Sequence, residues 1–304
     1  MNRRELIKEL RARGVENIFN RPLSYCTREE LEYALQTISE GSAFAHLSFS
    51  QIALYQKCPR QFYYRYVRGL KIPPAGATVV GRACHRAVEH DLKTALEKGT
   101  HESWSVLEDI YDLEFKTLVK EAKWDEEKPE EAHKSGKEAL KKYAIEVLPA
   151  ISPAAVEEVF EIHLPTLSAN LKGVIDLVDA EENAVIDHKT AKRKYSEDKL
   201  RSAQLTIYAM VKSVPTAGFN VLVRTKKPQV QVLRKEVTPD DYYRTLGDIL
   251  LVADCIYKLA FPPAPQDSWV CSKKWCGYWD ICRRELEEEV KELLPEELAL
   301  LGIQ

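Results

Sequence analysis

Two apolar segments in the middle of the sequence each carry one acidic residue: Asp176 lies within 171–178, and Asp187 lies within 184–190. A polar stretch centred on residues 181–182 joins the two segments, which is typical of a β-hairpin. If the strands pair symmetrically about this link, Asp176 lies opposite Asp187, with Cβ atoms about 5 Å apart. Two carboxylates at that separation can share one divalent cation.

A lysine follows the second acid at strand spacing. Strand alternation places Asp187 and Lys189 on one face and turns His188 to the other. Polar residues on the wet face of an exposed hairpin would give the same Asp-x-Lys pattern. However, Val, Ile and Leu flank both acids, and a buried carboxylate needs a cation or a partner. The sequence therefore predicts that two acids and a lysine converge at one site.

Cysteines form the second group of residues with chemical potential. The chain has seven, an odd number that suits metal ligation in a reducing compartment better than a disulfide framework. Three of them form the spacing Cys271-x4-Cys276-x5-Cys282, and Cys58 lies far earlier in the chain. All-thiolate ligation suits a [4Fe–4S] cluster and also Zn²⁺, and ligand softness does not choose between them. Unliganded packing is the third alternative.

Length and composition limit the class of protein. The 304 residues allow two domains or one large domain with appendages, and 45% of them are hydrophobic. Collagen-like, disulfide-scaffold and disordered proteins are excluded by 12 glycines, seven cysteines and this apolar content. No apolar run approaches the about 18 residues of a membrane span, and the start lacks the apolar region of a secretory signal. We expect a cytoplasmic protein without a membrane segment.

Charge gives no global argument for nucleic acid, because the net charge is −3. Residues 283–304 contain three basic residues and seven Glu, a balance of −4, so the remaining chain carries +1. Local basic clusters therefore matter more than the total.

Hydrophobic periodicity predicts the elements that must position these residues. Helices are expected over 3–13, from Thr27 to Ile38, from Ser50 to Tyr66 with a disturbance at Cys58-Pro59, and over 82–97, 103–122, 130–147, 196–213 and 239–261. Strands are expected over 156–164, 171–178, 184–190, 217–225 and 230–237. This order predicts a mixed α/β fold in which helices flank a mixed sheet.

The first 42 residues read as a separate helical appendage, joined through Gly41-Ser42-Ala43 to a main domain over 43–304. Their pattern of helix, Arg-Gly turn, loop and helix resembles the SAP and related helix-extended-loop-helix DNA-binding motifs. A packing or partner-docking appendage explains the pattern as well.

Six motifs in register give the larger unit a family resemblance over about residues 47–285. It resembles the RecB-like branch of the PD-(D/E)XK nuclease superfamily. The matching motifs are Ser48-Phe-Ser50 with Tyr55-Gln-Lys-Cys58-Pro-Arg-Gln-Phe-Tyr-Tyr-Arg65, Gly81-Arg-Ala-Cys-His85, Gly173-Val-Ile-Asp176, Val185-Ile-Asp187-His-Lys189-Thr, Gln204-Leu-Thr-Ile-Tyr208, and the C-terminal cysteines. The resemblance implies a restriction-endonuclease-like central mixed sheet flanked by helices.

The resemblance also implies site roles. Mg²⁺ or Mn²⁺ would be held by His85, Asp176, Asp187 and the backbone carbonyl of His188. Lys189 would orient the attacking water and help to deprotonate it. Gln204 and Tyr208 would line the site, and their i, i+4 spacing allows both to point at the hairpin from one helix face.

For the cysteines, the resemblance implies an iron–sulfur staple like that of AddB-type helicase–nucleases and CRISPR-adaptation exonucleases. Cys58, Cys271, Cys276 and Cys282 would hold a [4Fe–4S] cluster. The four-residue gap before Cys276 departs from the usual two. Candidate phosphate contacts are the basic residues of two further stretches, Arg60, Arg65, Lys192, Arg193 and Lys194.

The expected function is metal-dependent hydrolysis of DNA, most simply as an exonuclease on single-stranded or frayed ends in recombination, repair, or viral or CRISPR DNA processing. A non-catalytic DNA-binding or scaffold subunit of a helicase–nuclease or adaptation complex is the alternative, and a zinc-stapled adaptor is a third. No Gly-x4-Gly-Lys-Ser/Thr motif is present. Any unwinding would therefore come from a partner such as a helicase, beside a recombinase or an adaptation-complex protein.

Overall fold

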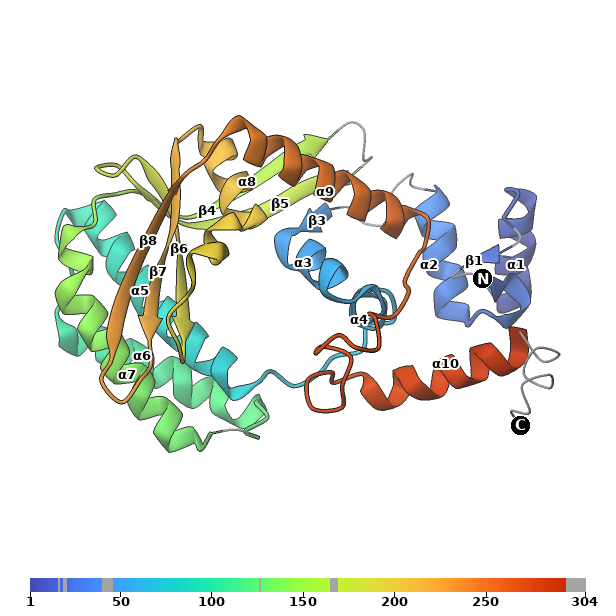
Figure 1. Ribbon diagram of the computed structural model, residues 1–304, viewed down its shortest axis with the longest axis horizontal. Helices are drawn as coiled ribbons and strands as arrows, with labels where there is room; N and C mark the ends of the chain where they lie inside the picture. The colour runs from blue at the N-terminus through green and yellow to red at the C-terminus, as the bar shows by residue number, and fades with distance from the viewer. Residues whose placement is uncertain (16, 19–20, 40–45, 126, 165–168, 294–304) are drawn as a thin grey trace. The chain divides into compact units, whose positions relative to one another are not determined.

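The computed structural model describes residues 1–15, 17–18, 21–39, 46–125, 127–164 and 169–293 (Figure 1). By their internal contacts they divide into two compact units. Unit 1 contains Met1–Ile72, Glu161–Lys172 and Asp248–Gln304, and unit 2 contains Pro73–Phe160 and Gly173–Gly247. Helices and a mixed sheet alternate as expected, so the mixed α/β fold class predicted from the sequence is confirmed.

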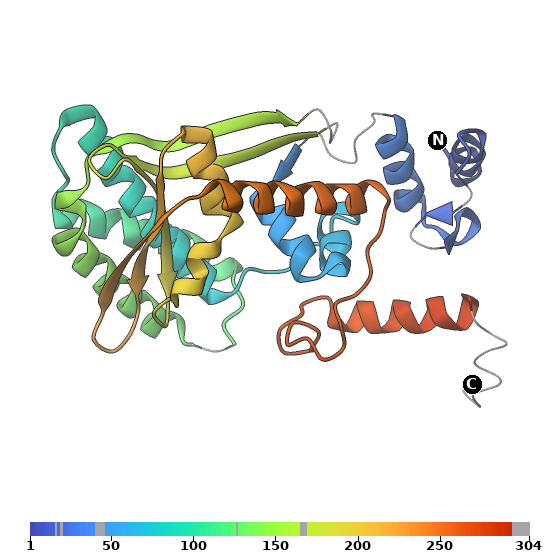
Figure 2. The same cartoon turned by 45° about the horizontal axis from the view of Figure 1, so that its top comes forward.

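Unit 2 is built around most of the mixed sheet. Its elements are α5 (Gly76–Lys98), α6 (Trp104–Leu118), α7 (Pro129–Glu146), β4 (Pro153–Leu164) as far as Phe160, β5 (Ala169–Asp179) from Gly173 onward, β6 (Ala184–Ala191), α8 (Ala203–Lys212), β7 (Thr216–Val223) and β8 (Gln229–Glu236). Strands β5 and β6 pair antiparallel, β6 and β7 parallel, and β7 and β8 antiparallel. Strands β4 and β5 pair as well, and Figure 2 shows them running side by side.

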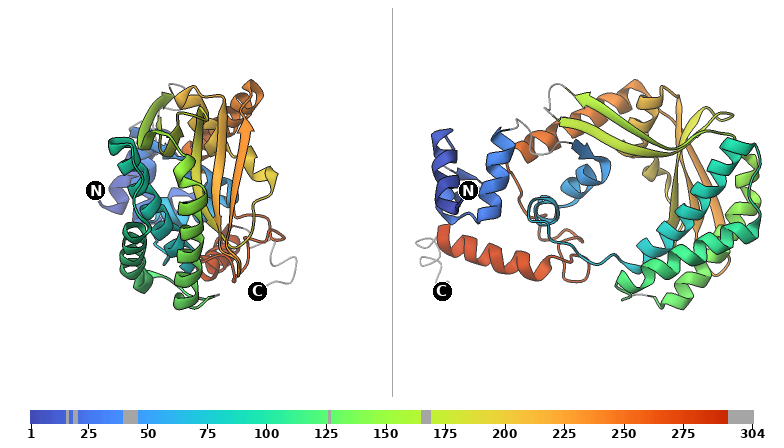
Figure 3. Two further views of the ribbon diagram at one scale, coloured as in Figure 1. Left: turned by 90° about the vertical axis from the view of Figure 1, so that its left-hand side faces the viewer. Right: turned by 180° about the vertical axis from the view of Figure 1, so that it is seen from behind.

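Helices cover the two faces of this sheet differently. Helices α5, α6 and α7 bury one apolar cluster with the inward side chains of the strands, including Ile186 of β6 (Figures 1 and 3). Because successive side chains of a strand point to opposite faces, Asp187 points to the other face. There it accepts a hydrogen bond from Gln204 of α8. Close packing between α6 and α7 requires a glycine, because a Cβ on Gly136 would lie 2.3 Å from the Tyr111 hydroxyl.

Unit 1 begins with a helical hairpin. Its helices are α1 (Arg3–Ala12) and α2 (Arg28–Ser39), with the short strands β1 (Asn17–Ile18) and β2 (Arg21–Pro22) between them (Figure 3). A capping box begins α2, since Glu30 N–H donates to Thr27 Oγ1 and Thr27 N–H donates to Glu30. Glu30 is also buried and accepts a hydrogen bond from the Tyr63 hydroxyl. The boundary near residue 42 stays a prediction, and its link at 41–43 lies outside the described residues.

The rest of unit 1 joins early and late segments of the chain. Its further elements are β3 (His46–Ser48), α3 (Phe49–Lys57), α4 (Pro59–Phe62), the π-helix Tyr63–Val67, the later part of α9 (Pro239–Tyr257), and α10 (Trp279–Leu293). Strand β3 pairs parallel with 170–172 of β5. The predicted disturbance at Cys58 is confirmed, because α3 ends before it and α4 begins with Pro59. Phe62 stacks on Phe261 from beyond α9, with ring centroids 5.8 Å apart.

Two predicted helices are shorter than expected. The one predicted over 196–213 is a 3-10 turn over Glu197–Arg201 followed by α8, because Ser202 between them has extended backbone. The one predicted over 239–261 ends at Tyr257, and Leu259 has a φ of 57° that a helix cannot continue through. Within the described ranges, no helix combines the length and the apolar character needed to cross a membrane.

Candidate active site

The two acids predicted from the hairpin lie on neighbouring strands. The antiparallel register of β5 and β6 pairs Leu177 with Ile186. This is the predicted register centred on 181–182, and one further step along it brings Asp176 beside Asp187. Both carboxylates are inside the protein, because Asp187 is 1% exposed and the Asp176 side chain is 13% exposed. Two adjacent buried carboxylates require positive charge nearby.

A lysine, a glutamine and a tyrosine surround Asp187. Lys189 Nζ lies 2.5 Å from Asp187 Oδ2. Gln204 Nε2 donates to Asp187 Oδ1 at 2.9 Å and lies 2.9 Å from the Tyr208 hydroxyl oxygen. The predicted one-sided arrangement of Asp187 and Lys189 and the shared face of Gln204 and Tyr208 are thus both present. His188 points away as predicted, with Nε2 2.9 Å from the hydroxyl oxygen of Tyr143.

His85 and Glu157 lie beside Asp176. His85 Nε2, on α5, lies 3.0 Å from Asp176 Oδ2 and 3.5 Å from Glu157 Oε1. These three ligand atoms all lie within 4.8 Å of one another. The backbone N–H of His188 donates to Asp176 Oδ2 at 2.9 Å, which fixes the carboxylate. Two of the four predicted ligand residues, His85 and Asp176, therefore belong to this group, and Glu157 joins them without having been predicted.

Glu157 is the residue that sequence reasoning missed. Regular alternation along β4 treats Glu158 as the neighbour that shares a face with Val156 and Phe160. In the structure, Glu157 has a φ of 52°, a left-handed conformation that interrupts the alternation. Its carboxylate approaches His85, whereas Glu158 pairs with Lys212 at 2.8 Å. Nothing in the Glu-Glu pair itself tells which of the two turns inward.

The charges of the site depend strongly on one another. Burial raises the pKa of Asp187 to about 6, since Lys189 only partly offsets it and Asp176 adds to it. Burial is the largest single influence on Asp176 and raises its pKa, but the hydrogen bond and charge of His85 together with His188 outweigh it and hold the pKa of Asp176 below its usual range. Burial opposes protonation of His85, yet Asp176 and Glu157 raise its pKa to about 9. Without a cation, His85 therefore carries a proton at neutral pH, and Asp187 takes one up more readily than an ordinary aspartate does.

The donor set fits a divalent cation. Carboxylate oxygens are the ligands that Mg²⁺ and Mn²⁺ prefer, and an imidazole nitrogen completes many Mn²⁺ sites. Asp176, Asp187 and Glu157 exceed the one lysine in charge, and a bound cation would supply the positive charge that protons otherwise supply. Oxygen and nitrogen donors therefore converge where a cation is electrostatically favoured.

An open groove lies beside this group of acids. It has a volume of about 570 Å³ and is lined by one face of α5 from Ala77 to Glu89, by Glu114 of α6 and by residues 188–190 of β6. Arg82 and Arg86 have side chains 60% and 56% exposed there. Arg82 lies three residues before His85 and four before Arg86, so it is a neighbour of both on the helix surface. That spacing could have identified both arginines from the sequence.

Gly81 lines the groove and leaves open space above the backbone of α5. A Cβ built on it would meet no atom within 4 Å, so no packing contact within the described residues requires a glycine at this helical position. Glycine inside a helix is less stable than alanine by about 0.5–1 kcal/mol. An unoccupied space above a helix backbone, one turn from His85, leaves room for a ligand to approach the backbone closely.

The sequence as a whole matches a known family over most of its length. The profile of the PD-(D/E)XK nuclease superfamily matches residues 46–283, which include every acid of the site. The chain belongs to the PD-(D/E)XK nuclease superfamily. Comparison with curated proteins gave no match.

Two solved structures match this PD-(D/E)XK nuclease at low sequence identity. One is a protein from Eubacterium rectale described as a "Putative exonuclease", with 12% identity and a TM-score of 0.50 over 82% of this chain and 92% of the other. A protein designated SSO0001 has 15% identity and a TM-score of 0.37 over 83% of this chain and 94% of its own. The first of these supports the fold alone, and nothing further is drawn from the second.

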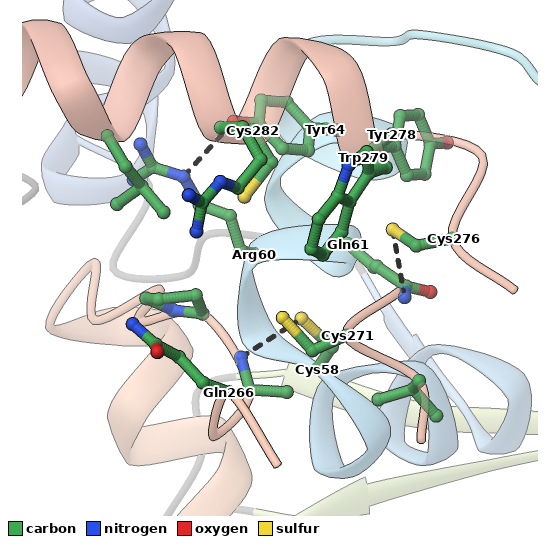
Figure 4. Close-up of a pocket in the computed structure, with 15 residues that line it drawn as sticks. Cys58, Arg60, Gln61, Tyr64, Gln266, Cys271, Cys276, Tyr278, Trp279 and Cys282 are labelled. Atoms are coloured by element: carbon green, nitrogen blue, oxygen red, sulfur yellow. Dashed lines mark hydrogen bonds between the residues drawn. The ribbon is translucent and has the colours of Figure 1, made fainter. Parts of the chain in front are cut away.

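The four cysteines predicted as ligands line one pocket of the nuclease. Cys58, Cys271, Cys276 and Cys282 come from the α3–α4 junction, the segment before α10 and α10 itself (Figure 4). Figure 4 shows the sulfurs of Cys58 and Cys271 side by side, with Cys276 and Cys282 further along the same pocket. Ala264 N–H donates to Cys58 Sγ, and Gln61 Nε2 donates to Cys276 Sγ, both at 3.4 Å.

The distances between the four sulfurs and the pKa values of the thiols limit which group this cysteine pocket can hold. Four sulfurs around one zinc at bonds of about 2.3 Å would lie about 3.8 Å apart. In the described part of the chain, no three of these sulfurs all lie within 4.8 Å of one another. Burial raises the pKa of Cys282 to about 11 and also raises that of Cys276, so both are thiols unless a metal ion replaces the proton. Four thiolate donors around one cavity fit a soft metal group.

The remaining three cysteines lie elsewhere. All seven cysteines are free of disulfides. Cys84 belongs to the apolar core of unit 2, where burial raises its pKa to about 12. Cys26 is buried in the N-terminal hairpin, and Cys255 is half-buried on α9.

The predicted phosphate contacts differ in their availability. Arg60 is 7% exposed and pairs with Glu289 of α10, so its guanidinium is engaged within unit 1. Arg65 is exposed and lies over the Tyr66 ring. Lys192 is exposed but pairs with Glu127 at 3.1 Å, whereas Arg193 and Lys194 are exposed beside it. Four of the five side chains can therefore reach a phosphate, and we leave Arg60 out of the proposed contacts.

Proposed function

We propose that this protein is a metal-dependent DNA nuclease of the RecB-like branch that acts as an exonuclease on single-stranded or frayed ends. The observation that carries the proposal is the convergence of Asp176, Asp187 and Lys189 on one hairpin, with His85 and Glu157 closing the other side. A scaffold protein has no need for three acids and a lysine at one point. The description of the Eubacterium rectale protein agrees with an exonuclease.

We assign cation binding to Asp176, Asp187, His85 and Glu157, with the His188 carbonyl as the backbone ligand. A bound Mg²⁺ or Mn²⁺ would lower the pKa of a water molecule and neutralise charge that builds on the phosphate. The chain's part is to hold these ligands still: the His188 N–H fixes Asp176, and Gln204 fixes Asp187.

Lys189 is the residue placed to act on the attacking water. Its side chain is 34% exposed, and the attraction of Asp187 and Asp176 outweighs the effect of partial burial and raises the pKa of Lys189 above its usual value. In this state it donates hydrogen bonds and stabilises negative charge on the phosphate oxygens. A cation held by Asp187 would weaken the hold of that carboxylate on the lysine proton; Lys189 would then release this proton to solvent and, as a neutral amine, could accept one from the water.

We assign the groove along α5 to the substrate strand. Arg82 and Arg86 would contact phosphates on either side of His85, and Gly81 would let the strand lie on the helix. Arg65, Arg193 and Lys194 are further exposed cations for the DNA backbone.

Digestion of end-labelled DNA tests the function. Linear and closed circular single strands are incubated with the protein and Mn²⁺ or Mg²⁺, with the Lys189→Ala variant as control. An exonuclease degrades the linear strand alone and releases short products from one end. Cleavage of the circle would identify an endonuclease, and cleavage by Lys189→Ala at the wild-type rate would refute the assigned site.

We further propose that Cys58, Cys271, Cys276 and Cys282 hold a [4Fe–4S] cluster. Their shared pocket and their spread beyond the tight spacing of zinc ligands support the larger group. Protein prepared without oxygen should be brown and contain iron and sulfide. A colourless protein with stoichiometric zinc would refute the cluster and leave the nuclease untouched.

The cellular setting follows from the same residues. Seven free cysteines suit the cytoplasm, where thiols stay reduced. A helicase, recombinase or adaptation-complex protein would supply DNA ends, and residues 1–42 would be the appendage that binds DNA or this partner. Co-purification with and without residues 1–42 tests that assignment.

A further inference from the structure

Two tryptophans are exposed on the segment between α9 and α10. Trp269 is 65% exposed and Trp275 is 48% exposed. Their ring centroids are 6.1 Å apart, with planes at 82°. Side chains of this size are mostly buried in proteins, and an exposed pair of them marks an interaction surface.

Lysines accompany both rings. Lys57 Nζ, at the end of α3, lies 5.3 Å from the Trp269 ring centroid, and Lys274 Nζ lies 4.6 Å from the Trp275 ring centroid. Lys273 is exposed between them in sequence and pairs with Asp280 at 3.3 Å. An ammonium within about 6 Å of a ring is attracted to its face. The surface therefore combines aromatic area with positive charge.

Backbone hydrogen bonds and a buried Val270 hold the segment between α9 and α10 in place, while the two tryptophan rings stay exposed to solvent. Val270 is 3% exposed and packs with Cys58 and Ala264, which anchors the chain between the two tryptophans. Ser272 O accepts the N–H groups of Trp275 and Cys276, and Ser272 Oγ donates to Trp269 O at 3.0 Å. Rings fixed before binding lose little conformational entropy when a ligand arrives.

We propose that Trp269 and Trp275, with Lys57 and Lys274, form a binding platform for single-stranded DNA. Bases of a single strand have free faces that stack on aromatic side chains, and lysines contact the phosphates between them. A protein partner would not need paired lysines over the rings, and a duplex keeps its base faces stacked internally. The platform rests on the proposed nuclease function for its substrate, but it lies in unit 1 and uses none of the catalytic residues.

Tryptophan fluorescence tests the platform directly. The full chain is titrated with a thymidine oligonucleotide without added divalent cation, so that binding is measured without cleavage. We expect quenching, because bases stack on two of the five tryptophans of the chain. The double variant Trp269→Phe/Trp275→Phe should bind with little loss of affinity but without this quenching.

Affinity measurements separate stacking from charge. Each of Trp269→Ala and Trp275→Ala should weaken binding by about 5- to 150-fold, the range for loss of one base stack. Lys274→Gln should reduce the slope of log affinity against log salt by about 0.7. Tyr243→Ala is the matched control, because Tyr243 is 77% exposed on α9 and should leave affinity unchanged.

The outcomes distinguish the platform from the nuclease. Equal affinity of the alanine variants and wild type, or equal quenching in the phenylalanine variant, refutes the platform even if the protein cleaves DNA. Quenching and weakened alanine variants support it even if no cleavage is found. Melting temperatures are measured for each variant; if an alanine variant melts early, the phenylalanine variant and the salt slope of Lys274→Gln decide.

Discussion

Replacing Gly81 by alanine is expected to make the protein more stable and a poorer nuclease. Alanine in a helix interior is favoured over glycine by about 0.5–1 kcal/mol. The added Cβ meets no atom within 4 Å, so no steric penalty offsets this gain. For a unit of this size the melting temperature should rise by about 2 °C.

The same methyl group occupies the space proposed for the substrate strand. Forcing one extra methyl group into a filled contact costs about 1–3 kcal/mol, which corresponds to about 5- to 150-fold in affinity. Binding of a labelled oligonucleotide without added divalent cation measures this loss, and single-turnover cleavage should fall with it. Stability and DNA affinity should therefore change in opposite directions.

Two other helical glycines provide controls. A Cβ on Gly247 of α9 also meets no atom within 4 Å, so Gly247→Ala should raise the melting temperature without changing binding. Gly136→Ala should lower it, because its Cβ would lie 2.5 Å from Val80 Cγ1. If Gly81→Ala binds and cleaves like Gly247→Ala, the strand does not run along this face of α5.

Four further predictions follow from the two sites and the appendage. Lys189→Ala should abolish cleavage while DNA affinity stays nearly unchanged, since one cation among several phosphate contacts contributes little; a parallel loss of binding would contradict its role. Glu157→Gln should weaken Mn²⁺ binding by about tenfold or more in calorimetry, whereas Glu158→Gln, which lies outside the ligand group, should bind Mn²⁺ like wild type. Cys282→Ala should lose the brown colour of anaerobically prepared protein, and Cys84→Ala should keep it. Deleting residues 1–42 should leave a folded, cleaving core that binds DNA or a partner less well, and an insoluble product would show that the appendage belongs to the core.

Local periodicity was sufficient to predict the hairpin. Its two apolar strands flank a short polar link, and symmetrical pairing about residues 181–182 predicts the register that the structure shows, with Leu177 opposite Ile186. The same reasoning places Lys189 beside Asp187 and Gln204 beside Tyr208, because these pairs depend only on strand and helix spacing.

Residues whose environment depends on distant parts of the chain could not be predicted in this way. Arg60 stands in a basic and aromatic stretch that reads as a DNA contact, but Glu289 from α10 neutralises it inside unit 1. Glu157 turns inward through a single left-handed residue, and no local pattern signals that conformation. Both effects arise from tertiary context rather than from propensity.

Unit 1 combines the first and the last segments of the chain, and this sets the order in which the two sites can form during synthesis. Cys58 leaves the ribosome with the first segment of the unit, whereas Cys282 belongs to the last. The two are 224 positions apart (282 minus 58), which at synthesis rates of about 5–20 residues per second is a delay of about 10–45 s. During this interval all of unit 2 is synthesised, and the acids of the hairpin can come together. Loading of the proposed cluster would therefore be a late step of biogenesis, and a nascent chain would acquire its acidic site before its cysteine pocket.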